Sequence, residues 1–304
     1  MVREMSGQLD RTTISDVDEE LKALILKAQK NEITEYHVYQ KLLQSTKSSS
    51  TKEILEKISK AEFDHYQFWK EYTLRDTKPK AFDVWKYYTL SRLLGLTFAL
   101  KLMERGEQRA QTAYETISRS IPAARRIMKE EDEHEKELIE LIDEERLRYV
   151  GSMVLGLNDA LVELTGVLAG LSFALQNTRL IAMVGSITGF AASLSMASSE
   201  YLSTKSETTT RDPAKAAVYT GFAYIVTVAV LIAPFLVLES LYAALGWSIL
   251  NAIVVILGFT YYVSVAKDVP FRKRFSEMVL VSLGIAFLSF LVGSIIRTLL
   301  GFDI

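Results

Sequence analysis

Two Glu-x-x-His motifs are the residues of this chain best suited to chemistry. Glu62 and His65 occur in AEFDH, and Glu131 and His134 occur in EEDEH. Residues three apart face the same way on a helix, so each pair can offer a carboxylate and an imidazole to one metal ion. A single pair is weak evidence, because an acidic, solvated helix face can contain a histidine without binding anything. The sequence has 3 histidines, however, and two of them fall in this pattern.

A second matched pair lies upstream of each motif. Glu32 precedes Tyr39 by seven residues, and Glu107 precedes Tyr114 by the same interval. One Glu from each of two helices, with one Glu-x-x-His from each of two others, is the ligand set of di-iron carboxylate bundles. The sequence therefore predicts a di-iron site formed by Glu32, Glu62, His65, Glu107, Glu131 and His134.

Three further acids lie near these ligands and are candidates for extra or alternative ligation: Glu35, Glu104 and Glu130. His37 fits no part of the pattern, and we interpret it as a packing or surface residue. Bridging carboxylates offset the charge of two metal ions, and neutral imidazoles complete the coordination while leaving positions open for oxygen chemistry. Iron is the expected metal, and Mn²⁺ or Zn²⁺ could take its place.

A second group of acids lies in apolar sequence. Asp159 and Glu163 are four residues apart, as are Met196 and Glu200, so each pair shares a helix face. Carboxylates inside a membrane are costly and mark ion or proton paths, although a carboxylate can instead hydrogen-bond a neighbouring helix or reach back to the interface. Met196 alone would be core filler, but beside carboxylates its thioether favours Fe²⁺ over Mg²⁺ or Ca²⁺.

The first group of residues requires a helical bundle to bring its members together. Helical periodicity runs through 15–147 and is interrupted at KSSS, DTKPK and SIP. We therefore predict four helices, at about 15–46, 51–75, 82–119 and 122–147. The apolar stretch 87–103 contains Arg92 and Lys101, and we interpret it as a buried or membrane-surface helix and not as a span.

The second group requires membrane helices. Charged residues are concentrated in 1–149, and long apolar stretches follow. A span needs roughly 20 residues of helix, because lipid offers no partners for open backbone groups. The predicted spans are about 149–175, 180–203, 217–238, 242–266 and 276–300. The predicted fold class is thus all-α, with a four-helix bundle at 1–147 and a five-span membrane domain at 148–304.

Basic residues set the predicted orientation. They gather before the first span, between the second and third, and between the fourth and fifth, whereas the alternate loops hold only Arg179. The positive-inside rule then puts the N-terminal domain in the cytoplasm and the C-terminus outside, in the cell membrane. The polar N-terminus predicts no cleavable signal peptide. The absence of cysteine excludes thiolate metal sites, and a net charge of −2 does not indicate nucleic-acid binding.

On these motifs the chain resembles two known families. Residues 15–147 resemble the ferritin-like, rubrerythrin-type bundle, without the cysteine-bound rubredoxin tail of many rubrerythrins. Residues 146–304 resemble the vacuolar iron transporter family, through VLGLNDALVELTGVLAG and SLSMASSEYLSTKSE. The order of the two parts is similar to that of the membrane-bound ferritins of bacteria and archaea, in which a cytoplasmic ferritin-like domain precedes an iron exporter.

The resemblance implies a homodimer of five-span subunits that moves Fe²⁺ out of the cytoplasm against protons. On the matching positions, Asp159 would be the transport-site carboxylate, and Met196 and Glu200 would line the path. Two positions depart from the family pattern: Ala160 stands where the family has glycine, and Glu163 stands where a small polar residue is expected. Glu163 could add a ligand or a proton acceptor, so the family's coupling stoichiometry does not carry over.

The expected function is therefore iron homeostasis by export. A di-iron domain would capture or oxidise Fe²⁺, and a membrane antiporter would exchange it for protons. Two alternatives stay open at this stage. One is a membrane-anchored di-iron ferroxidase or peroxidase, whose membrane half is an anchor or an outlet. The other is a Mn²⁺ exporter, because hard carboxylates also suit Mn²⁺.

Overall fold

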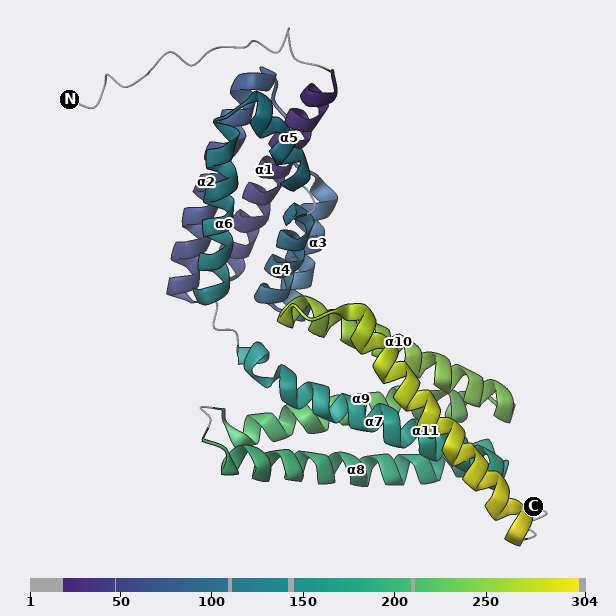
Figure 1. Ribbon diagram of the computed structural model, residues 1–304. Helices are drawn as coiled ribbons and strands as arrows, with labels where there is room; N and C mark the ends of the chain where they lie inside the picture. The colour runs from purple at the N-terminus through teal and green to yellow at the C-terminus, as the bar shows by residue number, and fades with distance from the viewer. Residues whose placement is uncertain (1–18, 47, 109–110, 142–144, 209–210, 301–304) are drawn as a thin grey trace. The chain divides into compact units, whose positions relative to one another are not determined.

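The computed structural model describes residues 19–46, 48–108, 111–141, 145–208 and 211–300. Every regular element among these residues is an α-helix, so the predicted all-α fold class is confirmed. The chain divides into two compact units, Met1–Glu144 and Glu145–Ile304 (Figure 1).

The N-terminal unit is built on the long antiparallel pair α1 and α2, against which shorter helices pack (Figure 1). Ser48 begins α2, because its Oγ accepts a hydrogen bond from the backbone N–H of Thr51 at 3.4 Å. Leu74, in the left-handed conformation, ends the same helix. The helices of this unit are α1 Glu19–Ser45, α2 Ser49–Thr73, α3 Ala81–Leu94, α4 Leu96–Gln108, α5 Gln111–Ser120 and α6 Ala124–Leu141.

Two apolar clusters hold α1 and α2 to their neighbours. One gathers Val38 of α1 and Ile58 of α2 with side chains of α3 and α4. The other gathers Ile25 of α1 and Trp69 of α2 with side chains of α5 and α6. The middle turns of α1 and α2 lie between these clusters, so polar residues placed there are shielded from water and need partners within the protein.

The helix predicted at 82–119 is wrong as a single element, because the chain reverses at Gly95. Gly95 has φ 104° and ψ 155°, a conformation that residues with a Cβ avoid. As a result α3 and α4 pack side by side, and α5 follows as a separate helix (Figure 1). Sequence pattern did not distinguish these outcomes, since a lone glycine in a periodic stretch is also tolerated inside a helix.

The C-terminal unit contains 5 helices long and apolar enough to cross a membrane, in agreement with the predicted number of spans. Asn177 begins α8 and Asp212 begins α9, and the side chain of each accepts hydrogen bonds from two backbone N–H groups. The helices of this unit are α7 Glu145–Leu175, α8 Thr178–Ser206, α9 Pro213–Val237, α10 Leu241–Lys267 and α11 Phe271–Leu300.

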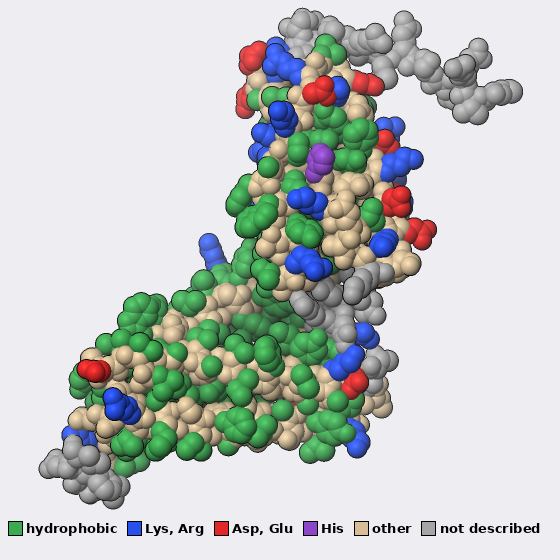
Figure 2. All heavy atoms as spheres, turned by 180° about the vertical axis from the view of Figure 1, so that it is seen from behind, with side chains coloured by type: hydrophobic (Ala, Val, Ile, Leu, Met, Phe, Trp, Pro, Cys, Tyr) green, Lys and Arg blue, Asp and Glu red, His purple; other side chains and the backbone are tan. Residues whose placement is uncertain are grey.

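An apolar core from α7, α8, α9 and α10 holds the C-terminal unit together. α11 packs closely along α7, and a Cβ on Gly293 would clash with the carbonyl oxygen of Gly170. Large apolar side chains also cover the outward faces of these helices, as Figure 2 shows for the face in view. An exterior of this kind suits lipid and not water.

Candidate metal centre and membrane carboxylates

Four of the predicted iron ligands come together in the middle of the N-terminal unit. Glu32 of α1, Glu62 and His65 of α2, and Glu131 of α6 each place a ligand atom within 4.8 Å of the others. The first three side chains are buried and the fourth is partly buried. The i, i+3 spacing on α2 puts its two ligands on one face, as the motif predicts.

His65 lies at the centre of this cluster. Its Nδ1 is 2.8 Å from Glu131 Oε1, 3.8 Å from Glu32 Oε2 and 3.9 Å from Glu62 Oε2. Its Nε2 is 3.0 Å from Oε2 of Glu130, one of the three extra candidates. A protonated imidazole in this position balances part of the negative charge of the surrounding acids.

The electrostatics of the cluster follow from burial and from these contacts. Burial by itself would lower the pKa of His65, but the nearby carboxylates of Glu131 and Glu32 raise that pKa to about 11. Burial would raise the pKa of Glu32, but His65 brings it below its ordinary value. Burial and the charges of Glu131 and Glu35 raise the pKa of Glu62 well above its ordinary value. The metal-free cluster therefore holds protons at neutral pH.

Two aromatic side chains hold Glu32 in place. The hydroxyl of Tyr114 donates to Glu32 Oε1 at 2.6 Å, and the indole N–H of Trp69 donates to the same oxygen at 3.0 Å. The other carboxylate oxygen of Glu32 faces His65. Such support fixes the orientation of a ligand. The sequence repeat contained Tyr114 but gave it no role, and no pattern in the sequence marked Trp69.

The remaining predicted ligands are placed less fully. His134 follows Glu131 by one turn of α6, and its ring stacks on that of His65 with centroids 6.2 Å apart. Glu107 lies in the last turn of α4, but its side chain is outside the described residues. Glu104 is half-buried on the same helix. The roles of His134, Glu107 and Glu104 as ligands stay predictions.

The donor set of the cluster fits a metal ion. Carboxylates combined with imidazole suit iron, manganese or zinc. The Oε2 atom of Glu62 is buried and has no hydrogen-bond partner among the described residues. Because buried polar atoms are rarely left without a partner, this oxygen and the gathered ligands both indicate a bound cation.

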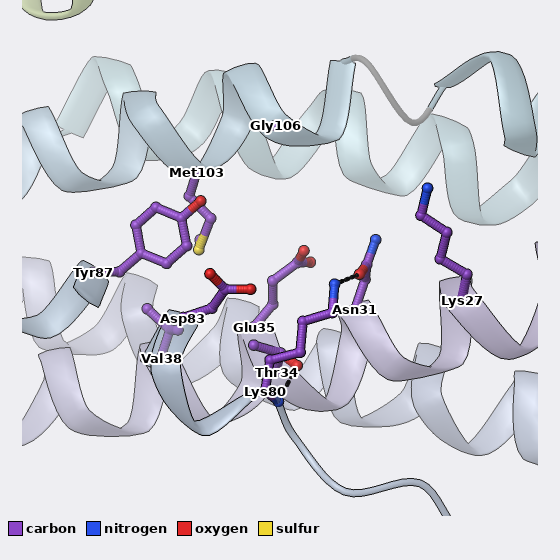
Figure 3. A pocket seen from close by; sticks show the side chains of 10 residues that line it. All are labelled: Lys27, Asn31, Thr34, Glu35, Val38, Lys80, Asp83, Tyr87, Met103 and Gly106. Carbon is purple, nitrogen blue, oxygen red and sulfur yellow. Dashed lines mark hydrogen bonds between the residues drawn. The ribbon is translucent and has the colours of Figure 1, made fainter. Parts of the chain in front are cut away.

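A cavity of about 230 Å³ lies among α1, α3 and α4 (Figure 3). Glu35 and Asp83 line this cavity. At its edge, the ammonium of Lys80 donates a hydrogen bond of 2.8 Å to Asn31 Oδ1. The charge of Glu35 also raises the pKa of Glu62, so the cavity borders the cluster. The role of Glu35 as an extra ligand stays a prediction.

In the C-terminal unit, Asp159 and Glu163 lie one turn apart on α7. The hydroxyl of Tyr224, on α9, donates to Glu163 Oε2 at 2.8 Å. The sequence analysis missed Tyr224, because it lies 61 residues from its partner and belongs to no motif. Within the single chain Asp159 is half-buried and Glu163 is exposed, although both belong to a candidate span.

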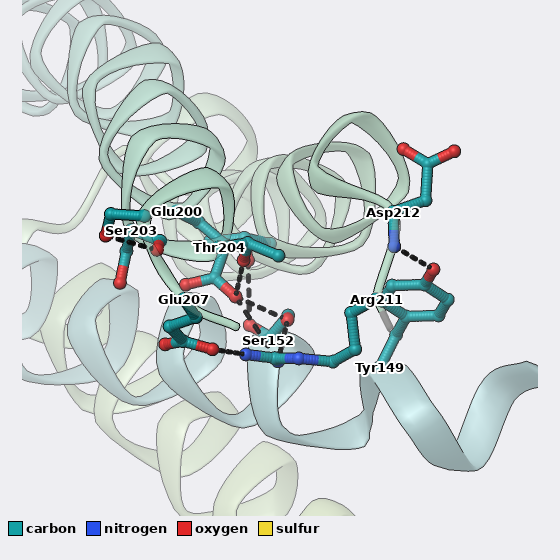
Figure 4. A network of polar contacts seen from close by, with 10 residues as sticks. Tyr149, Ser152, Glu200, Ser203, Thr204, Glu207, Arg211 and Asp212 are labelled. Carbon is teal, nitrogen blue, oxygen red and sulfur yellow. Dashed lines mark hydrogen bonds and ion pairs between the residues drawn. The ribbon is translucent and has the colours of Figure 1, made fainter. Parts of the chain in front are cut away.

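Glu200 lies in a network of polar side chains near the C-terminal end of α8 (Figure 4). Its Oε1 accepts from Ser152 at 2.6 Å and from Thr204 at 3.4 Å, and lies 3.8 Å from the guanidinium of Arg211. Arg211 also pairs with Glu207 at 2.7 Å. An arginine that the sequence analysis used only to set orientation thus neutralises a predicted path residue.

These polar groups lie at successive levels of α7. Glu200 contacts Ser152, which precedes Asp159 by seven residues, or about 10 Å along a helix. Glu163 is one turn further on. Met196, one turn before Glu200 on α8, packs against the apolar core of the unit. Its role as a path residue stays a prediction.

Comparison with known families gives two matches. A rubrerythrin model matches residues 7–73, which contain Glu32, Glu62 and His65. A VIT-family model matches residues 150–212, which contain all four predicted path residues. The chain thus joins a region similar to rubrerythrin to a region similar to the VIT family. No curated protein and no solved structure matched it.

These matches confirm the resemblance inferred from the motifs. The rubrerythrin domain implies di-iron binding, and the VIT family implies transport of a metal ion by an integral membrane protein. The rubrerythrin match ends at residue 73, before α6. Glu131 is therefore assigned to the site by its distance from the other ligands and not by the family match.

Proposed function

We propose that this protein exports Fe²⁺ from the cytoplasm across the cell membrane in exchange for protons, after capture by the rubrerythrin domain. The arrangement of Asp159, Glu163 and Tyr224 carries this proposal. Two acids one turn apart inside a span are costly, and such residues mark ion and proton paths. A membrane anchor would not need them.

The order of polar groups along α7 supports a path. Glu200 lies at the loop end of the unit, Asp159 lies about 10 Å further along α7, and Glu163 follows one turn later. A cation bound at each in turn would move through the apolar part of the unit. Cation binding displaces protons from carboxylates, so exchange at these groups would couple Fe²⁺ exit to proton entry.

The exposure of Glu163 supports a homodimer. A carboxylate on the outer face of a span is unfavourable against lipid. A second copy placed against this face of α7 would cover Glu163 and Asp159 and enclose the path between two subunits. Orientation follows the same logic as before, with the basic loops and the rubrerythrin domain on the cytoplasmic side.

The rubrerythrin domain would serve as the intake. Glu32, Glu62, His65 and Glu131 would hold iron, with Glu107 and His134 completing the predicted set. When bound, a di-iron pair supplies oxidation of Fe²⁺ by oxygen or peroxide. Tyr114 and Trp69 fix Glu32, and Glu35 draws cations toward the cluster from the adjoining cavity.

Flux into proteoliposomes tests the proposal. The full chain is reconstituted with a trapped dye that Fe²⁺ quenches, with and without an opposing pH gradient, for the wild type, Asp159→Asn and Glu239→Gln. Glu239, an exposed acid between α9 and α10, is the matched control. We expect gradient-dependent flux for the wild type and the control, and only the rate of empty vesicles for Asp159→Asn.

Two results would contradict the proposal. If the wild type fills vesicles no faster than empty liposomes do, the membrane half is an anchor for a di-iron enzyme. If Mn²⁺, measured with a matching dye, is transported and Fe²⁺ is not, the protein is a manganese exporter.

A further inference from the structure

The membrane unit contains a cavity of about 420 Å³ that none of the predicted path residues lines. It lies between the first half of α7, the end of α10, the turn at 268–270 and the first turns of α11. The candidate spans end and begin at this turn, so the cavity opens at the level of the membrane surface. Volumes of this size accommodate a small ligand or the head of a larger one.

The mouth of this cavity is basic. Lys273 and Arg274 line it, both are exposed, and neither side chain forms an ion pair or hydrogen bond among the described residues. Glu277 is the one acid among the lining residues and offsets half of their charge. Lys267 and Arg272 flank the same turn. The mouth therefore carries a net positive charge.

The interior of the cavity is largely apolar, with Thr260 and Asn158 as its polar residues, and the Thr260 hydroxyl lies 3.8 Å from the sulfur of Met278. Phe259 and Val263 of α10 contribute apolar walls. The Oδ1 atom of Asn158, on α7, is buried at the cavity and has no hydrogen-bond partner among the described residues. A buried amide oxygen without a partner calls for a hydrogen-bond donor. A ligand that fits must therefore combine an anionic group, an apolar part and a hydroxyl or N–H.

We propose that this cavity binds an anionic phospholipid with a hydroxylated headgroup, of the phosphoglycerol type. Lys273 and Arg274 bind the phosphate, a headgroup hydroxyl donates to Asn158 Oδ1, and the acyl chains follow the apolar walls. Basic pockets between membrane helices bind anionic headgroups in this way. Because Asn158 is next to Asp159 on α7, the lipid would also fix this helix beside the predicted path. The binding itself does not depend on the proposed transport.

Lipid binding to the full-length protein in detergent tests the proposal. Short-chain phosphatidylglycerol and phosphatidylcholine are titrated, and bound lipid is counted by native mass spectrometry. We expect the wild type to bind phosphatidylglycerol more tightly than phosphatidylcholine. The Lys273→Gln, Arg274→Gln double variant should bind phosphatidylglycerol about 30-fold more weakly than the wild type does. The matched control is Lys267→Gln with Arg272→Gln, which removes the same charge from the same turn outside the cavity and is expected to bind nearly as the wild type does.

Two further variants separate a built site from general surface charge. Glu277→Gln should tighten binding about threefold, a gain that misfolding does not produce. Asn158→Ala should reduce the preference for phosphatidylglycerol over phosphatidic acid, which lacks the headgroup hydroxyls. The proposal is wrong if both lipids bind the wild type equally or if the two double variants lose binding equally. It is also wrong if inorganic phosphate displaces the lipid at equal concentration, because the site would then take a free anion.

Discussion

The two groups of acids in this chain differ in how far basic side chains neutralise them. In the rubrerythrin-like region, the buried acids Glu32 and Glu62 and the partly buried Glu131 surround the imidazole of His65, which supplies a compensating charge from within the cluster. In the VIT-family domain, Glu200 is paired with Arg211, whereas Asp159 and Glu163 have no basic partner among the described residues. The first group is therefore a closed cluster that contains its own positive charge. The second is an open series of acids at successive levels of α7.

This difference suits the two proposed tasks. A closed cluster of preorganised ligands retains a cation, because fixed ligands need no rearrangement to bind it. An open series of acids at successive levels of α7 binds a cation weakly at each step, which favours passage over storage. In the proposed function, the same residue types serve capture in one region and movement in the other.

The largest expected effect is on the closed cluster. His65→Ala removes the cation from among buried carboxylates and should destabilise the metal-free protein by about 3–5 kcal/mol, as loss of one partner of a buried ion pair does. Thermal unfolding of the full chain, followed by tryptophan fluorescence, measures this. His37→Ala is the control, since His37 packs on Tyr36 outside the cluster. Equal destabilisation by the two changes would show that His65 has no special electrostatic role.

The second effect is on metal binding to the closed cluster. The pKa values of His65 and Glu62 are raised, so the folded, metal-free protein holds more protons than the unfolded chain. The stability from His65 is complete below pH 6.5 and is lost as pH rises toward about 11. Metal must displace these protons, so affinity should rise about tenfold per pH unit for each proton released.

Calorimetric titration of Mn²⁺ into the full chain, in two buffers of different ionisation enthalpy between pH 6 and 8, counts those protons. Asp159→Asn leaves the cluster intact and should release the same number. A pH-independent affinity with no proton release would mean that His65 is neutral in the metal-free protein.

The third effect compares two tyrosines that each support one acid. Tyr224→Phe leaves Glu163 without its donor, and loss of a hydrogen bond to a charged group, worth about 1.5–3 kcal/mol, should reduce Fe²⁺ flux about tenfold or more. Tyr114→Phe leaves Glu32 with Trp69 as a donor, so metal affinity should fall less, by about threefold. The proteoliposome flux assay measures the effect of Tyr224→Phe, and calorimetric metal titration measures that of Tyr114→Phe. Unchanged flux in Tyr224→Phe would show that this hydrogen bond has no part in transport.

The smallest effect concerns the one neutralised acid of the path. Arg211→Gln removes the guanidinium that pairs with Glu200. An incoming Fe²⁺ ion then has to displace only water, and not the guanidinium, from the Glu200 carboxylate. We expect the Fe²⁺ concentration for half-maximal flux to fall about threefold, because partly exposed ion pairs are worth about 1 kcal/mol or less. Arg179→Gln, in the first turn of α8, is the control. An unchanged value would place Glu200 outside the path.

Several features followed from the sequence because they depend on local geometry. The i, i+3 spacing of Glu62 and His65 fixes a shared face on any helix, and so does the i, i+4 spacing of Asp159 and Glu163. Long apolar stretches must form helices in lipid, which set the number of spans. The glycine that reverses the chain at position 95 was not predicted, because its backbone angles depend on how α3 and α4 pack against α1 and α2.

By itself the sequence determined the residue types, the faces on which they lie and the division into a charged and an apolar half. Only the tertiary structure decided which distant groups complete each site. Trp69 of α2 hydrogen-bonds Glu32 of α1, and Tyr224 of α9 hydrogen-bonds Glu163 of α7. Arg211, in the loop before α9, pairs with Glu200 of α8. The physical reason is that the spacing of residues sets the face of the helix on which each side chain lies. Which side chains meet between two helices depends on how the helices pack, and no short sequence pattern encodes that packing.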